Sequence, residues 1–136
     1  MLFRSAVIAA QQAAVAEDSW IYPPTVLTHV LPGQPAFEEE LFGPVWAVTS
    51  FDSESEAIRL ANASSFGLGA SVWSVDEARI NRLIGTLETG NVFVNDFVRS
   101  DPRLPFGGVK RSGHGKELGE MGFFEFVNWK TVYWKE

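Results

Sequence analysis

The sequence predicts an α/β fold in which a mostly parallel sheet is flanked by helices and followed by a terminal strand. Between Val45 and Asn95, segments rich in β-branched and aromatic residues alternate with amphipathic helical patterns. This alternation is typical of βαβ units, which build parallel sheets. Apolar residues then recur at alternate positions over 124–134. A strand this apolar favours pairing with the edge of another sheet, so we expect it to mediate association.

In the first half of the chain, turn residues separate segments with clear periodicity. An Ala/Gln-rich stretch has high helix propensity, whereas Pro23-Pro24 forbids helix and precedes an alternating, strand-like segment. A second strand-like segment follows Gly43-Pro44. In order, these patterns predict a helix over 6–17, a strand over 25–30, a turn over 32–35, a short helical piece over 36–42 and a strand over 45–51.

Helix-start signals organise the second half. Ser53 followed by Glu56 is a capping box, and apolar residues recur at helical spacing between Asp76 and Leu87. The stretch 96–122 is dense in glycine, and long ordered loops in a compact domain are usually functional. The patterns predict a helix over 53–61, a strand over 68–73, a helix over 76–87, a strand over 91–95 and a functional loop over 96–122.

The composition excludes several classes of partner and chemistry. The chain's 136 residues suit one domain and are enough to bury a hydrophobic core. Its net charge of −6 argues against nucleic acid or an anionic membrane as partner, because both need concentrated Lys and Arg. Two distant histidines and no cysteine suggest no metal site and exclude a cysteine nucleophile in this chain. No stretch approaches the roughly 20 apolar residues of a membrane span, so we expect a cytoplasmic protein.

Residues 1–19 differ in character from the rest of the chain. One basic residue before a short Ala-rich run resembles a signal peptide only weakly, because Gln11-Gln12 interrupts the run. The sequence over 2–5, LFRS, matches the in-frame translation of a common sequencing adapter. We therefore interpret residues 1–19 as a truncation artefact and expect the chain to begin within a longer protein.

Two motifs carry the most specific information in the chain. The first, over 39–45, reads EELFGPV, and the second, over 105–113, reads PFGGVKRSG. In this order, together with the terminal strand, they resemble the C-terminal part of the aldehyde dehydrogenase superfamily. The resemblance covers 20–136 and implies that 20–122 form part of the catalytic domain. It also implies that 123–136 form an oligomerisation strand.

The first motif implies a cofactor site. Glu40 matches the glutamate that accepts hydrogen bonds from the nicotinamide ribose hydroxyls, a task that suits an acceptor-only carboxylate. Phe42 matches the aromatic residue that packs beside the nicotinamide ring. The alternatives are a solvated acidic run for Glu40 and ordinary core packing for Phe42. Gly43-Pro44 fixes a turn that would direct both side chains to one site.

The second motif and the residues before it imply a substrate site. The stretch 100–106 is most similar to the succinate-semialdehyde branch, in which a serine at the position of Ser100 helps to hold the distal carboxylate of the substrate. Phe106 matches an aromatic residue of the substrate tunnel. A simple turn role for Ser100 remains an equal alternative. Arg99 and Arg103 could add charge, although we expect surface or structural ion pairing for both.

Other residues of this region have structural interpretations. The glycines at 107, 108, 113 and 115 suggest a phosphate loop, but His114 stands where that motif requires Lys, and no strand directly precedes the loop. We expect these glycines to permit tight backbone turns. Asn95 either lies near the catalytic centre or caps a turn. Lys116 replaces the arginine that is usual in the family, and we expect this difference to have little bearing on the chemistry.

The resemblance implies an oxidoreductase that uses NAD or NADP. In that family a cysteine thiolate attacks the aldehyde, hydride passes to NAD(P)⁺, and water activated by a glutamate hydrolyses the thioester. The chain contains neither that cysteine nor that glutamate, so we predict no catalytic residue within it and no activity in isolation. The preferred interpretation is a C-terminal fragment of a succinate-semialdehyde dehydrogenase that forms homo-oligomers through its last strand. A non-catalytic association module and a small-ligand-binding domain remain alternatives.

Overall fold

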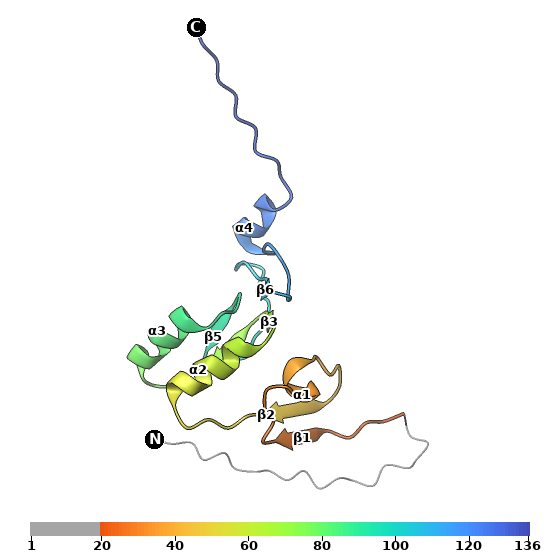
Figure 1. Ribbon diagram of the computed structural model, residues 1–136. Helices are drawn as coiled ribbons and strands as arrows, with labels where there is room; N and C mark the ends of the chain where they lie inside the picture. The colour runs from red at the N-terminus through yellow and green to blue at the C-terminus, as the bar shows by residue number, and fades with distance from the viewer. Residues whose placement is uncertain (1–19) are drawn as a thin grey trace. The chain divides into compact units, whose positions relative to one another are not determined.

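A computed structural model describes residues 20–136 of the chain (Figure 1). The chain divides into two compact units between Ser64 and Ser65. The helix predicted over 6–17, like the whole segment 1–19, lies outside the described residues. No helix in the described part of the chain is long and apolar enough to cross a membrane.

The first unit contains a parallel pair of strands, β1 (Thr25–Thr28) and β2 (Val45–Val48). The pair is in register from Thr25 opposite Val45 to Thr28 opposite Val48. The pairing continues beyond β1, where the Val30 N–H donates to the Val48 carbonyl at 3.1 Å. The parallel direction predicted from the alternating pattern is therefore confirmed for this pair.

The connection between β1 and β2 contains the short helix α1 (Pro35–Glu38). Proline at the first helical position favours its start, since a proline there loses no hydrogen bond. The helix ends earlier than the predicted 36–42, because Glu39 already has extended backbone angles. Glu40 and Phe42 consequently lie on a turn between α1 and β2 rather than on a helix.

The helix α2 (Glu54–Ala63) begins at the predicted capping serine. The Ser53 hydroxyl accepts from the Glu56 N–H at 3.2 Å, which satisfies one of the unpaired donors of the first turn. The Glu56 carboxylate accepts from the backbone N–H of Asp52 at 2.9 Å, one residue earlier than the standard reciprocal contact. The predicted helix start is confirmed, with this shift in the returning hydrogen bond.

Replacing Ser53 with alanine is expected to lower the free energy of unfolding by about 1 kcal/mol, because the Glu56 N–H loses its acceptor. Urea unfolding followed by far-ultraviolet circular dichroism measures the change. The exposed Ser50, which lies outside α2, provides the control S50A with an expected change near zero. Equal effects of S53A and S50A would contradict a capping role for Ser53.

The second unit contains four short strands and two helices. The strands β4 (Ala70–Val72) and β5 (Val92–Val94) pair in parallel and are connected through α3 (Glu77–Thr86). The strands β3 (Phe66–Gly67) and β6 (Val109–Lys110) pair antiparallel. The described residues thus form three two-stranded sheets, two parallel and one antiparallel. The predicted α/β class is confirmed, but the single mostly parallel sheet is confirmed only in part.

The helix α3 matches the predicted segment 76–87 closely. Asp76 caps its N-terminus, where the carboxylate accepts from the Arg79 N–H at 3.0 Å. That backbone hydrogen bond lowers the pKa of Asp76 below its ordinary value. The carboxylate therefore stays ionised and continues to cap the helix at moderately acidic pH.

The C-terminal part of the chain differs from the predicted strand. Phe123 and Phe124 lie in the short helix α4 (Gly119–Phe124), and residues 125–136 belong to no strand of the structure. Figure 1 shows this last segment running away from α4. A strand needs a partner edge for its hydrogen bonds, and the described residues provide none for this segment. Pairing with another chain stays a prediction.

The expected hydrophobic core is almost absent from the described residues. Only two apolar side chains are buried there, Val30 with 4% and Val72 with 7% of its surface exposed. Each sheet has two strands, which is too few to enclose a core between layers. Large apolar side chains such as Trp46, Trp129 and Trp134 are exposed in consequence. This surface is suited to burial against further protein.

Candidate functional site

The turn between α1 and β2 displays Glu40 and Phe42 at the surface. Both side chains are exposed, and Phe42 retains 89% of its accessible surface. The end of the turn is anchored to β1, because the Pro44 carbonyl accepts from the Thr25 N–H at 2.8 Å. Core packing, one of the two interpretations of Phe42, is therefore not what this structure shows.

Phe42 has an unusual backbone conformation. Its φ angle is +47°, in the left-handed region that bulky residues rarely adopt. Such a conformation costs on the order of 1–3 kcal/mol, and residues that keep it cluster at binding sites. An exposed aromatic ring gains nothing from burial that could offset this cost, so its position suits contact with a ligand or with another protein surface.

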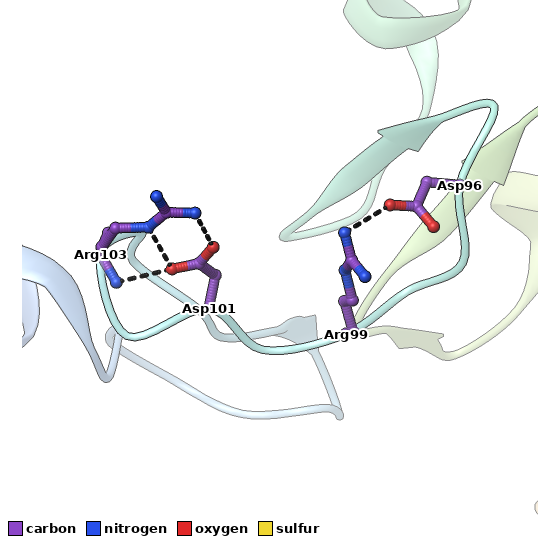
Figure 2. Close-up of polar contacts among 4 residues, drawn as sticks. All are labelled: Asp96, Arg99, Asp101 and Arg103. Atoms are coloured by element: carbon purple, nitrogen blue, oxygen red, sulfur yellow. Dashed lines mark hydrogen bonds and ion pairs between the residues drawn. The ribbon is translucent and has the colours of Figure 1, made fainter.

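The Ser100 loop contains two separate ion pairs (Figure 2). Arg99 pairs with Asp96 at 2.8 Å. Arg103 donates to both carboxylate oxygens of Asp101, from Nε at 2.9 Å and from Nη2 at 2.6 Å. The expected ion pairing of both arginines is confirmed. Ser100 itself is exposed and lies between the two pairs in the sequence.

The fork of hydrogen bonds from Arg103 changes the titration of both partners. Its side-chain hydrogen bonds hold the pKa of the Asp101 carboxyl far below the ordinary 3.8, and the same contact raises the pKa of Arg103. The stabilisation from this pair is present above pH 3.8 and is lost as the pH falls through the lowered pKa of Asp101. The Asp101–Arg103 pair, which follows Ser100 in the loop, therefore stays charged near neutral pH.

Replacing Arg103 with glutamine is expected to raise the pKa of Asp101 back towards 3.8, because the charged donor is lost. A pH titration of the Asp101 carboxyl carbon by NMR measures this shift. The matched control is R99Q, since Arg99 pairs with Asp96 and acts on Asp101 only through its charge. A shift in R99Q as large as that in R103Q would contradict the assignment.

Phe106 lies at the start of the glycine-rich loop, and hydrogen bonds hold its backbone. Its N–H donates to the Glu117 carbonyl at 2.7 Å, and its carbonyl accepts from the Glu117 N–H at 2.8 Å. The half-buried Phe106 side chain lines a cavity of about 400 Å³. His114, Lys116 and Glu125 also line that cavity. The structure thus places Phe106 at a cavity wall, beside both acidic and basic groups.

Two side chains that the sequence did not mark as functional form hydrogen bonds to the loop that follows Phe106. Asn91 Nδ2 donates to the Gly107 carbonyl at 3.0 Å, and Lys116 Nζ donates to the same oxygen at 2.8 Å. A Cβ atom at Gly107 would lie 2.6 Å from the Gly115 carbonyl oxygen, so the backbone packs too closely there for a side chain. Lys116 therefore has a definite contact role, which its position in the sequence did not indicate.

Asn95 closes the end of the β4–β5 pair. Its side-chain amide donates to the Ser74 carbonyl at 2.9 Å and accepts from the Ser74 N–H at 2.9 Å. Its φ angle of +53° is one that asparagine tolerates better than most residues. Of the two interpretations left open for Asn95, the structure supports turn capping.

The four predicted site residues fall into two pairs along the chain. Glu40 and Phe42 belong to the first unit, and Ser100 and Phe106 belong to the second. Ser100 and Phe106 lie on the same loop, on either side of the Asp101–Arg103 pair. Among residues 20–136 no group of histidine and acidic side chains could hold a metal ion.

Comparisons with known proteins give consistent matches. The model of the aldehyde dehydrogenase family matches residues 4–132. A probable succinate-semialdehyde dehydrogenase [NADP(+)] from Synechocystis is 54% identical over 112 residues, which are 82% of this chain and 25% of that protein. The succinate semialdehyde dehydrogenase [NAD(P)+] Sad from Escherichia coli is 49% identical over 115 residues, or 85% of this chain and 25% of the relative.

Solved structures match as well. The succinic semialdehyde dehydrogenase from Streptococcus pyogenes, solved in complex with NADP+, aligns with a TM-score of 0.82 and 37% identity. That alignment covers 91% of this chain and 27% of the other. The chain thus spans about a quarter of the length of the relatives that it matches.

Proposed function

The chain belongs to the aldehyde dehydrogenase family, and we propose that it is the C-terminal part of an enzyme that oxidises succinate semialdehyde to the carboxylic acid with NAD(P)⁺. The observation that carries this proposal is the 54% identity with a probable succinate-semialdehyde dehydrogenase. The relatives bearing that name include one described with NADP(+) and one with NAD(P)+, so both nucleotides remain in the proposal.

The turn between α1 and β2 fits the nicotinamide end of such a cofactor. When bound, NAD(P)⁺ would supply the hydride acceptor. The exposed Glu40 carboxylate is acceptor-only and can take hydrogen bonds from two neighbouring ribose hydroxyls. The exposed Phe42 ring offers an apolar face beside a planar heterocycle. The left-handed backbone of Phe42 supports this role, because its conformational cost is understandable if the ring must be displayed.

The Ser100 loop supports the choice of a substrate with a distal carboxylate. The Ser100 hydroxyl can donate one hydrogen bond to a carboxylate oxygen. Arg99 and Arg103 already pair with acidic groups of their own loop, so a cationic partner for the substrate would have to come from elsewhere in the enzyme. Phe106, at the wall of its cavity, would line the path of the aliphatic part.

The chain on its own is proposed to be inactive. It contains no cysteine, and thioester formation needs a thiolate nucleophile. Its contribution to catalysis would be to bind and orient cofactor and substrate, which can supply a large part of a rate enhancement.

A chimeric enzyme tests the proposal directly. In the Synechocystis relative, the segment that corresponds to residues 20–136 is replaced by these residues. We expect NADP⁺-dependent oxidation of succinate semialdehyde, measured by NADPH absorbance, at a rate within about tenfold of the parent enzyme. A difference of one methylene group in the substrate pocket would change the rate by about that factor. A chimera that assembles like the parent but prefers an aldehyde without a carboxylate would contradict the proposed substrate.

We also propose that residues 123–136 form the contact between copies of the enzyme. Support comes from the exposed aromatic residues along this segment, with Trp129 80%, Tyr133 84% and Trp134 86% exposed. Apolar surface of this extent favours association. Sedimentation of the 136-residue chain should show oligomers that W129E/W134E converts to monomers, whereas K130E is the control. Association of the chain without any binding of NADP⁺ would favour the alternative of a non-catalytic association module.

A further inference from the structure

Two donors from different parts of the second unit meet on one backbone oxygen. The Gly107 carbonyl accepts from Asn91 Nδ2 at 3.0 Å and from Lys116 Nζ at 2.8 Å. A carbonyl oxygen has two lone pairs, so both hydrogen bonds can form at once. We propose that Asn91 and Lys116 are positioning residues that fix Phe106 by holding the carbonyl of the residue after it. We call Asn91, Gly107 and Lys116 the carbonyl clamp.

Each donor of the carbonyl clamp is itself anchored to a second backbone oxygen. Asn91 Nδ2 also donates to the Leu68 carbonyl at 2.7 Å. Lys116 Nζ also donates to the Gly90 carbonyl at 3.3 Å. The clamp therefore ties the Gly107 peptide to the residues that precede β4 and to those that precede β5.

The clamp restricts the backbone of Phe106 because hydrogen bonds also hold the neighbouring peptide groups. The N–H and the carbonyl of Phe106 both bond to Glu117, at 2.7 and 2.8 Å, and Glu117 directly follows Lys116. With the Gly107 carbonyl held as well, three backbone groups of Phe106 and Gly107 have partners. A fixed backbone restricts the rotamers that are open to the Phe106 side chain at the cavity of about 400 Å³.

Charge makes Lys116 the stronger of the two donors. Hydrogen bonds from an ammonium group are shorter and stronger than those from a neutral amide, and the Lys116 distance to the shared oxygen is the shorter one. The Lys116 residue is half-buried, so water competes less for its ammonium. Removing the ammonium should loosen Phe106 more than removing the Asn91 amide.

Amide exchange in the full 136-residue chain tests the clamp. In K116M, which keeps a similar length but no donor, exchange at the Phe106 and Glu117 amides should rise about tenfold, as expected for the loss of a charged hydrogen bond. N91A should raise it less, and K116R should remain within about twofold of the parent because it keeps a cationic donor. The control is K130M, at an exposed position of the last segment.

The backbone N–H of Asn95 donates to the Val72 carbonyl at 2.9 Å. Its exchange rate reports on the stability of the rest of the second unit. Its exchange should stay unchanged in K116M. Unchanged exchange at Phe106 and Glu117 would overturn the proposal. An equal rise at Asn95 would also overturn it, because Lys116 would then only stabilise the unit as a whole.

The inference rests on the proposed function for what Phe106 does with the substrate, and kinetics separate the two. In the chimeric enzyme, K116M should raise the KM for succinate semialdehyde about tenfold and leave kcat within about twofold. Faster exchange with an unchanged KM would support the clamp and contradict the substrate role of Phe106. Unchanged exchange in an active chimera would overturn the clamp and leave the proposed function intact.

Discussion

Replacing Glu40 with alanine in the chimeric enzyme is expected to lower kcat/KM for NADP⁺ about 100-fold. Each hydrogen bond from a ribose hydroxyl to the carboxylate is charge-assisted and contributes about 1.5–3 kcal/mol, and 1.4 kcal/mol corresponds to a tenfold change. Glu40 is exposed on a turn and lies outside α1, so its removal should not unfold the first unit. Initial rates at varied NADP⁺ concentration give the value.

The neighbouring carboxylates provide matched controls for Glu40. Glu39 is also exposed, so E39A removes the same charge from the same acidic run and should change kcat/KM less than about threefold, the scale of a surface charge. Glu38 is not suitable as a control position, because its carboxylate accepts a hydrogen bond from the Gly33 N–H at 2.8 Å and E38A would remove that contact. Similar losses in E40A and E39A would mean that the run acts only through its overall charge.

Local chemistry explains which elements could be predicted from the sequence. Pro23-Pro24 precedes β1, Ser53 starts α2 and Asp76 starts α3, and each signal acts within a few residues. The alternation of these elements was sufficient for the α/β class and for the parallel direction of two strand pairs. Gly43-Pro44 likewise predicted a turn, and the chain bends there, whereas the helix predicted over 36–42 ends at Glu38.

Contacts between distant residues explain what the sequence did not reveal. The strands β3 and β6 have two residues each and form only because Phe66 meets Lys110 across the chain. The helix α4 contains glycine, which lowers helix propensity, so its segment had the pattern of a loop. The carbonyl clamp joins Asn91, Gly107 and Lys116 through backbone oxygens, and no local pattern marks a side chain that bonds to a remote carbonyl.

The described residues lack most of the predicted hydrophobic core for a related reason. Composition measures how much apolar surface a chain has, and not whether the chain contains enough layers to cover it. The strands in residues 20–136 pair only two by two, and the tryptophans lie exposed. In the proposed enzyme, this chain, which spans about a quarter of the length of its relatives, would bury this surface against the remaining part.

Replacing Gly90 with alanine is expected to lower the free energy of unfolding of the 136-residue chain by about 3 kcal/mol, the upper range for forced overpacking. An added Cβ would overlap the Gly107 carbonyl oxygen and lie 2.8 Å from Lys116 Nζ. Backbone cannot yield as a flexible side chain can, so the Gly107 loop must move and the hydrogen bonds of the carbonyl clamp must lengthen. Urea unfolding followed by circular dichroism measures the loss.

Gly85 provides a control of opposite sign for G90A. It lies inside α3, and a Cβ added there would meet no atom within 4 Å. G85A should therefore stabilise the chain by about 0.5–1 kcal/mol, because alanine has the higher helix propensity. Both substitutions add one methyl group to the second unit, so a loss of stability in G90A reflects the crowding around Gly90 rather than the added methyl group itself. If G90A were as well tolerated as G85A, the close approach of Gly90 and Gly107 would be excluded, and with it the tight packing on which the carbonyl clamp depends.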